Sequence, residues 1–136
     1  MTADALVLLA MAGHVGWTTL LYVALTLARA PRVWGQGAAE GFFARREAAI
    51  AANLSNQFEW PLFFHVVCGL AISAGTTTPG FALIAWLFLT GRALHSGVQI
   101  LTDNVRLRGL IFTINFLAVL VLWGLHGAVL LRSSLL

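Results

Sequence analysis

The chain has 136 residues, of which 60% are hydrophobic and 10% are charged, and its mean hydropathy is +0.88. Soluble domains carry about a quarter charged residues, so this composition excludes an ordinary soluble protein and indicates an integral membrane protein. The net charge of +3 rests on arginines scattered along the chain, with no lysine, a pattern that argues against nucleic-acid binding.

Four apolar runs are each long enough to cross a bilayer, which needs about 20 residues per helix. They cover residues 5–28, 48–73, 80–101 and 109–131. The sequence therefore predicts an all-α integral membrane protein, a four-transmembrane-helix bundle that forms one domain over residues 1–136. The first run is expected to remain as a helix, because it has neither a basic segment before it nor a small-residue cleavage site after it.

The arginines between the runs predict the orientation. Four of them precede the second run and two precede the fourth: Arg29, Arg32, Arg45, Arg46, Arg106 and Arg108. By the positive-inside rule, both termini are expected on the non-cytoplasmic side. Because the chain carries no organelle address, a bacterial inner membrane is the expected location.

The stretch "NLSNQFEWPLFF", residues 53–64, is unusually polar for a membrane helix. At 100° per residue, Asn56 and Gln57 lie on one face with Glu59 nearby, and a carboxylate at this depth costs at least about 2.5 kcal/mol without a partner. Counted from the inner helix ends, Glu59 lies about 16 Å deep and Arg92 about 13 Å deep, so we expect an ion pair between them. Such a pair serves either as a functional site or as a polar contact that holds helices together.

One histidine falls in each predicted helix. His14, His65 and His126 are expected at one level, about 8 to 12 Å from the outer surface, while His95 lies in the inner half. Three histidines at one level raise the alternative of a metal or haem site. Because no helix carries two of them at i and i+4, we expect hydrogen-bonding roles and no metal site.

Two segments carry a resemblance to a known family. The segments "RREAAIAANLSNQFEWPLFF" and "GRALHSGVQILTDNVRLRGLIF" resemble the MAPEG family, the membrane-associated proteins of eicosanoid and glutathione metabolism. The family pattern has Asn-x-x-Glu followed closely by proline on helix 2, then an arginine-rich helix 3 and an arginine in the link to helix 4. The matching positions here are Asn56, Glu59, Pro61, Arg92 and Arg106.

The resemblance implies a homotrimer with glutathione held at the subunit interfaces. Asn56 and Glu59 are then expected to bind glutathione together with Arg92 and His95, and Arg106 is expected to stabilise its thiolate as the catalytic residue. A guanidinium keeps its charge in proteins and lowers the pKa of a nearby thiol. The implied activity is a glutathione transferase or peroxidase that acts on a lipophilic electrophile.

The chain also departs from the family pattern. Ala52 stands where the transferases have an arginine, and His95 and Gln99 stand where they have tyrosines. Three functions stay open at this point: a thiol-dependent enzyme, a membrane protein that binds a lipid or small ligand without turnover, and a purely structural trimer.

Overall fold

The computed structural model describes residues 1–35 and 41–135. Within them the chain forms five helices, α1 (Ala3–Val33), α2 (Phe42–Ser55), α3 (Pro61–Ser73), α4 (Pro79–Leu101) and α5 (Val105–Ser133). Three of these, α1, α4 and α5, are long and apolar enough to cross a membrane, and α3 is a shorter apolar helix. The all-helical membrane class predicted from the sequence is confirmed.

The predicted helix over residues 48–73 is two helices, so the described residues hold five helices where four were expected. The break covers residues 56–60, between α2 and α3. Pro61 has no N–H, and inside a continuous helix its ring would clash with the carbonyl of Gln57, so it is tolerated only in a first turn. Pro61 indeed begins α3.

The other helix ends follow local signals. The hydroxyl oxygen of Thr78 accepts a hydrogen bond from the backbone N–H of Phe81 at the start of α4, and Asn104 accepts one from Leu107 at the start of α5. The predicted span 80–101 agrees closely with α4. The helix predicted over residues 5–28 runs further, to Val33, so much of the expected basic loop is helical; residues 36–40 of that loop lie outside the described part.

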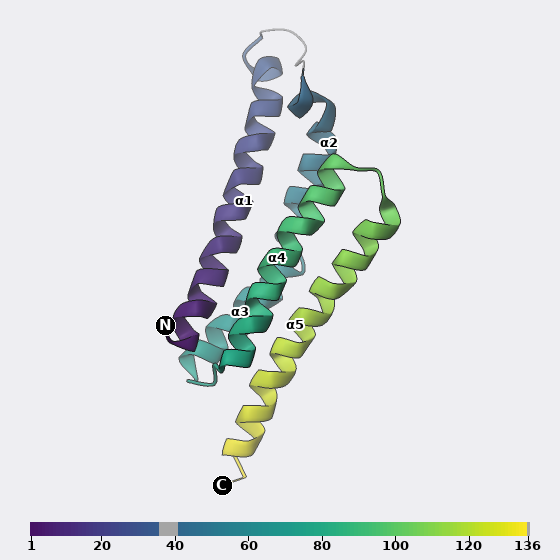
Figure 1. Cartoon of the computed structure of the whole chain (residues 1–136). Coiled ribbons are helices and arrows are strands. Elements are labelled where there is room, and N and C mark those ends of the chain that lie inside the picture. The colour runs from purple at the N-terminus through teal and green to yellow at the C-terminus, as the bar shows by residue number, and fades with distance from the viewer. Residues whose placement is uncertain (36–40, 136) are drawn as a thin grey trace.

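The helices pack around α4, which lies between α1 and α5 and also contacts α2 (Figure 1). α3 contacts α1 and α5. Both termini lie at the same end of the bundle, with the α3–α4 turn, and the α4–α5 connection lies at the opposite end (Figure 1). The arginines Arg106 and Arg108, at the start of α5, therefore lie at the end opposite the termini.

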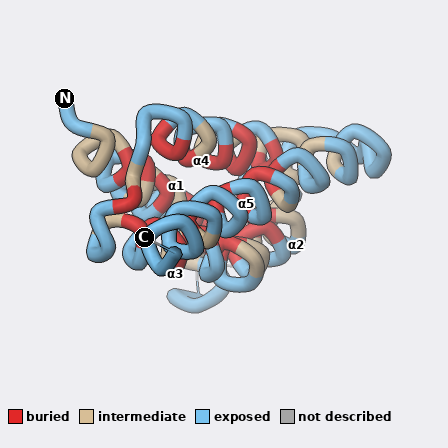
Figure 2. Tube along the Cα trace, turned by 90° about the horizontal axis from the view of Figure 1, so that it is seen from below, coloured by how far each residue is buried: buried red, intermediate tan, exposed pale blue. Residues whose placement is uncertain are grey.

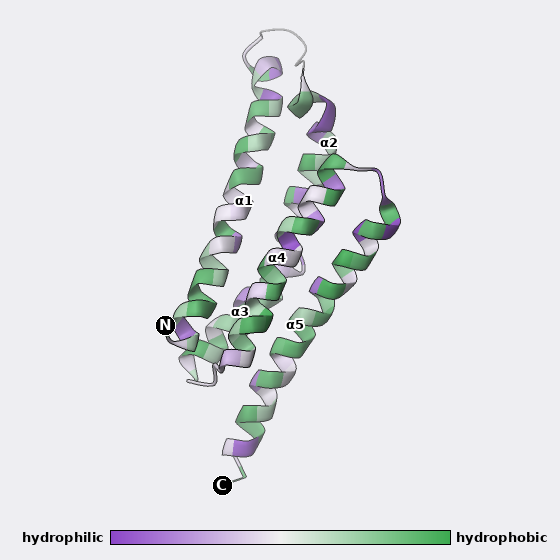
Figure 3. Cartoon of the chain, in the orientation of Figure 1, coloured by the Kyte–Doolittle hydropathy of each residue, from purple (hydrophilic) through white to green (hydrophobic). Residues whose placement is uncertain are grey.

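Apolar side chains fill the interior along the facing sides of the helices, where the buried stretches gather in Figure 2. The rings of Phe64 and Phe88 stack with their centroids 4.1 Å apart, and Val119 and Leu122 of α5 are fully buried beside the same cluster. Many large apolar side chains point outward instead, and hydrophobic residues extend along the helices (Figure 3). This outward apolar surface is what contact with lipid requires.

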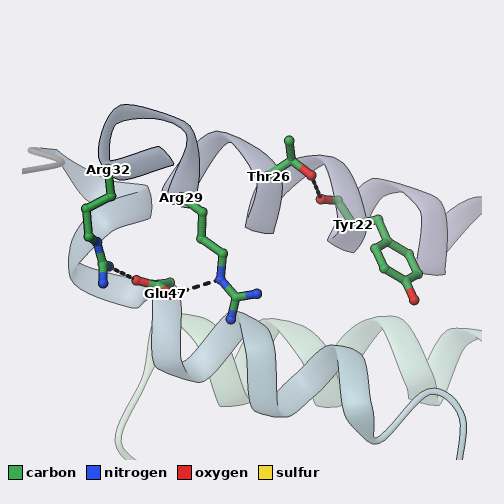
Figure 4. A network of polar contacts seen from close by, with 5 residues as sticks. All are labelled: Tyr22, Thr26, Arg29, Arg32 and Glu47. Atoms are coloured by element: carbon green, nitrogen blue, oxygen red, sulfur yellow. Dashed lines mark hydrogen bonds and ion pairs between the residues drawn. The ribbon is translucent and has the colours of Figure 1, made fainter. Parts of the chain in front are cut away.

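A pair of ion contacts ties α1 to α2 near the end opposite the termini. Arg29 Nε donates to Glu47 Oε1 at 2.9 Å, and Arg32 also pairs with Glu47 (Figure 4). On the same stretch of α1, the Thr26 hydroxyl donates to the Tyr22 carbonyl. The hydrogen bond from Arg29 holds the pKa of Glu47 below its usual value, because it favours the ionised carboxylate.

Candidate functional site

Arg92 of α4 is 0% exposed and lies beside the break between α2 and α3. Its Nη2 donates to the backbone carbonyl of Asn56 at 2.8 Å, and its Nε donates to Gln57 Oε1 at 3.2 Å. The expected ion pair with Glu59 is wrong for the described residues: Glu59 is exposed, and it belongs to none of the ion pairs found there.

The break explains why Arg92 has these partners. In a continuous helix the Asn56 carbonyl would accept from the N–H of Trp60, four residues on. That bond is absent among the described backbone contacts, and Arg92 supplies the donor instead. A buried carbonyl without a partner costs about 1–3 kcal/mol. The guanidinium therefore compensates for the interrupted backbone, as is typical where helices break at membrane depth.

Hydrogen bonds continue from Gln57 to two histidines. Gln57 Oε1 also contacts His14 Nε2 at 3.1 Å, and His14 Nδ1 contacts His65 Nε2 at 3.0 Å. His126 lies elsewhere and contacts the Thr76 hydroxyl at 2.8 Å. The sequence placed these three histidines at one level. In the structure His14 and His65 form a hydrogen-bonded pair, and His126 lies apart from them. In the described part of the chain, no group of three potential metal ligands occurs.

A pocket of about 440 Å³ lies on the other side of the break, between α2, α4 and α5. We call it the α2–α5 pocket; its lining residues are Ala52, Asn56, His95, Gln99, Val105, Arg108, Gly109 and Phe112. It lies near the α4–α5 connection, at the end of the bundle opposite the termini. A smaller hollow of about 260 Å³ shares Ala52, Gln99, Val105 and Arg108 with it, so the two form one polar region, and the smaller hollow is also lined by Asp103.

The polar side chains of the α2–α5 pocket have hydrogen-bonding capacity to spare. Gln99 Oε1 accepts from Asn53 Nδ2 at 2.9 Å and from Asn56 Nδ2 at 3.3 Å. Neither Gln99 Nε2 nor Asn56 Oδ1 takes part in a hydrogen bond within the described structure. His95 is 2% exposed, and its Nδ1 is buried without a partner there. The pocket therefore offers free amide donors and acceptors and an imidazole to a ligand.

Arg108 gives the α2–α5 pocket its charge, since none of the described lining residues is acidic. Arg106, which the resemblance assigns to the thiolate, is exposed and does not line this pocket. The two arginines are about 200° apart around the helix, so one faces inward while the other faces outward. In the described structure the arginine that lines the pocket is Arg108.

The spacing of residues along α5 indicates which of the two arginines faces the pocket. Two residues that line the pocket and four buried residues follow alternating steps of four and three: Arg108 and Phe112, then Asn115, Val119, Leu122 and His126. Steps of this kind mark one face of a helix. Arg108 could therefore have been assigned to the interior from the sequence, whereas Arg106 falls outside the series.

The structure brings together Asn56 and His95 in the α2–α5 pocket, with Arg92 directly behind Asn56. It places Glu59 and Arg106 on exposed positions outside it. Sequence reasoning missed the role of Gln57, whose Oε1 forms hydrogen bonds with both Arg92 and His14. The pocket can hold a small polar anion, because its guanidinium, amide and imidazole side chains are of types that bind carboxylate, amide or thiolate groups.

Comparison with known proteins identifies the family of the chain. No curated protein and no solved structure matches the chain. The model of the MAPEG family matches residues 5–128, a range that begins in α1, ends in α5 and includes both Arg92 and the whole α2–α5 pocket. The chain is an integral membrane protein and belongs to the MAPEG family.

Proposed function

We propose that the protein binds a low-molecular-weight thiol, glutathione first among them, in the α2–α5 pocket and transfers it to a lipophilic electrophile. The observation that carries the proposal is the convergence of Asn56, His95, Gln99 and Arg108 on one pocket without an acidic lining residue. Glutathione presents two carboxylates, an ammonium, two peptide groups and a thiol. The pocket offers a guanidinium for an anionic group, and amide and imidazole groups that can hydrogen-bond with the peptide groups.

Arg108 is the residue that we assign to the thiolate. A guanidinium stays protonated at every physiological pH and stabilises a neighbouring thiolate, which lowers the thiol pKa. The free amide atoms of Asn56 and Gln99 can pair with the peptide groups of the ligand. The imidazole of His95, which lines the pocket, supplies one further hydrogen bond.

The transfer step needs only the thiolate and a membrane-soluble electrophile. With a chloronitrobenzene, the thiolate sulfur forms a bond to the ring carbon that carries chlorine, the carbon–chlorine bond breaks, and chloride leaves. The thiol proton is released to water when the thiolate forms. The apolar outer surface of the bundle (Figure 3) gives such electrophiles access from the bilayer.

The proposal includes a homotrimer, as the family resemblance implies. Glu59 and Arg106 are exposed in the single subunit, so in a trimer each is available to a site on a neighbouring subunit. The predicted role of Glu59 in glutathione binding then depends on assembly, whereas the proposal gives the thiolate role to Arg108 in place of Arg106. Light scattering of the purified protein, after subtraction of the detergent mass, tests this part; a monomer removes it.

Calorimetric titration of glutathione into the detergent-solubilised protein tests binding. We expect saturable binding that is lost in Arg108→Gln, because the substitution removes the charge while keeping a polar side chain. Thr113→Val on the exposed face of α5 is the control, and it should bind glutathione normally. Absence of binding by the unmodified protein contradicts the proposal.

A second candidate function is binding of a lipid or small ligand without turnover. It is favoured by the absence of a hydroxyl side chain among the described lining residues of the α2–α5 pocket, because a hydroxyl donor is one common way to hold a thiolate. Saturable binding of glutathione without conjugation of any electrophile supports this alternative over the enzyme.

A further inference from the structure

A second cavity lies between α1, α3 and the break that precedes α3. We call it the histidine cavity; its volume is about 310 Å³ and its lining residues are His14, Val15, Thr18, Thr19, Tyr22, Gln57, Phe58, Leu62 and His65. It shares none of its described lining residues with the α2–α5 pocket. Val15, Phe58 and Leu62 are exposed on the lipid-facing surface, so the cavity adjoins the bilayer.

The hydrogen bonds fix where the protons of the two histidines lie. Arg92 Nε can only donate, so the Gln57 atom that faces it must be the carbonyl oxygen. The same oxygen faces His14 Nε2, which must therefore carry a proton. In a neutral His14 the Nδ1 is then an acceptor, and His65 Nε2 must donate to it.

Neutral imidazoles are the consistent choice here. Protonating His14 as well would place a second positive charge one amide away from the buried guanidinium of Arg92, at a large electrostatic cost. A neutral His65 that donates from Nε2 keeps Nδ1 as an acceptor. That Nδ1 has no hydrogen-bond partner among the described residues, so it remains available to a ligand.

The two threonines of the histidine cavity also present acceptors. The Thr18 hydroxyl donates to the His14 carbonyl at 2.9 Å, and the Thr19 hydroxyl donates to the Val15 carbonyl at 2.9 Å. Each hydroxyl proton is thus used within α1, while each oxygen retains lone pairs. The Tyr22 hydroxyl has no hydrogen-bond partner in the described structure and can both donate and accept.

We propose that the histidine cavity binds an amphiphile whose polar end is a hydroxyl group, a long-chain alcohol or an alkylphenol. A hydroxyl donates one hydrogen bond, which suits the acceptors of His65 and the threonines, and it accepts one, which suits Tyr22. An ester or ether end has no proton to donate. A carboxylate end meets mostly acceptors and is disfavoured for the same reason. The alkyl chain lies against Val15, Phe58 and Leu62.

Competitive photolabelling in lipid nanodiscs tests the proposal. The probe is para-octylphenol with a diazirine on its alkyl chain, and the competitors are unlabelled para-octylphenol and its methyl ether. We expect labels on α1 and α3 beside the cavity. We expect the phenol to compete about tenfold better than the ether, the ratio for one net hydrogen bond of ordinary strength.

Variants distinguish a specific binding site from a hydrophobic groove that lipids occupy without specificity. His65→Phe and Thr18→Val each remove an acceptor and should reduce the preference for the phenol over the ether. Thr113→Val removes a hydroxyl that is also bonded within its own helix, but on α5 away from the cavity, and should leave the preference unchanged. If His65→Phe does not fold, the proposal is tested by the preference for the phenol over the ether in Thr18→Val and in the unmodified protein.

Equal competition by the phenol and its ether overturns the proposal, as does labelling confined to other helices. A preference that survives both His65→Phe and Thr18→Val overturns it as well. None of these readouts depends on glutathione, so the result is independent of the proposed thiol chemistry.

Discussion

Arg92 of α4 donates a hydrogen bond of 2.8 Å to the backbone carbonyl of Asn56, the residue at which α2 ends. A side chain on one helix thus completes the backbone hydrogen bonding of another. The contact also holds Asn56 at the edge of the α2–α5 pocket. The broken helix and the candidate site are therefore parts of one arrangement.

Removal of Arg92 should destabilise the protein strongly. Arg92→Met leaves the Asn56 carbonyl without a donor, while Gln57 Oε1 keeps its hydrogen bond from His14 Nε2, and we expect a loss of about 2 kcal/mol in the free energy of unfolding, within the range of about 1–3 kcal/mol for a buried unsatisfied group. Thermal unfolding in detergent measures the change.

The double variant Arg92→Met/Pro61→Ala tests whether the break between α2 and α3 is the reason that Arg92 is needed for stability. An alanine at position 61 restores an N–H and lets the helix continue, so the N–H of Trp60 can reach the Asn56 carbonyl. We expect the double variant to be more stable than the sum of the single effects predicts. Strict additivity shows that Arg92 and the break are not coupled.

Glu59→Gln should change the thermal midpoint little. Glu59 is exposed, and in the described structure it forms no ion pair, so neutralising it breaks no direct contact and removes only a longer-range attraction to Arg92. Thermal unfolding beside Arg92→Met checks the contrast. A loss as large as that of Arg92→Met restores the ion pair that the sequence suggested.

Gly91→Ala should destabilise the contact between α4 and α5. A Cβ at position 91 falls 2.0 Å from Asn115 Oδ1, far closer than van der Waals contact allows. Asn115 is buried with neither side-chain polar atom hydrogen-bonded in the described structure, so shortening it costs no hydrogen bond. Gly91→Ala/Asn115→Ala should therefore recover most of the midpoint lost in Gly91→Ala; no recovery contradicts the steric account.

The stabilisation from Glu47 should depend on pH. Its folded pKa is lowered from 4.5 by the hydrogen bond from Arg29, so the contribution is complete above that value and disappears as pH falls through the folded pKa. We expect Glu47→Gln to have a slightly lower thermal midpoint than the unmodified protein at pH 6. The difference should vanish in strong acid. A difference that persists there assigns the effect to packing.

Hydropathy was sufficient to predict the membrane class and the extent of α4, because lipid contact requires long apolar helices whatever their detailed packing. The break between α2 and α3 was less visible. A proline such as Pro61 disturbs a helix, but only the structure shows that α2 ends at Ser55 and that α3 begins at Pro61. A proline restricts the backbone locally without determining how far the helix unwinds.

The partner of Arg92 could not be read from the sequence. Depth along two helices brought Glu59 and Arg92 to the same level, but depth does not say which way a side chain points. The freed carbonyl of Asn56 is a backbone group and carries no sequence signal of its own. The inward position of Arg108, by contrast, follows from the spacing of buried residues on α5.

The pH dependence of conjugation in Arg108→Ala and Arg106→Ala is the most direct test of the thiol site. The rate of glutathione conjugation to a chloronitrobenzene is measured for both variants and for the unmodified protein. We predict a large loss for Arg108→Ala that shrinks as pH rises toward the ordinary thiol pKa of about 8.5, with a small loss for Arg106→Ala and similar thermal midpoints for both. The reverse ranking moves the catalytic role to Arg106, and no conjugation by the unmodified protein at any pH contradicts the proposed transferase.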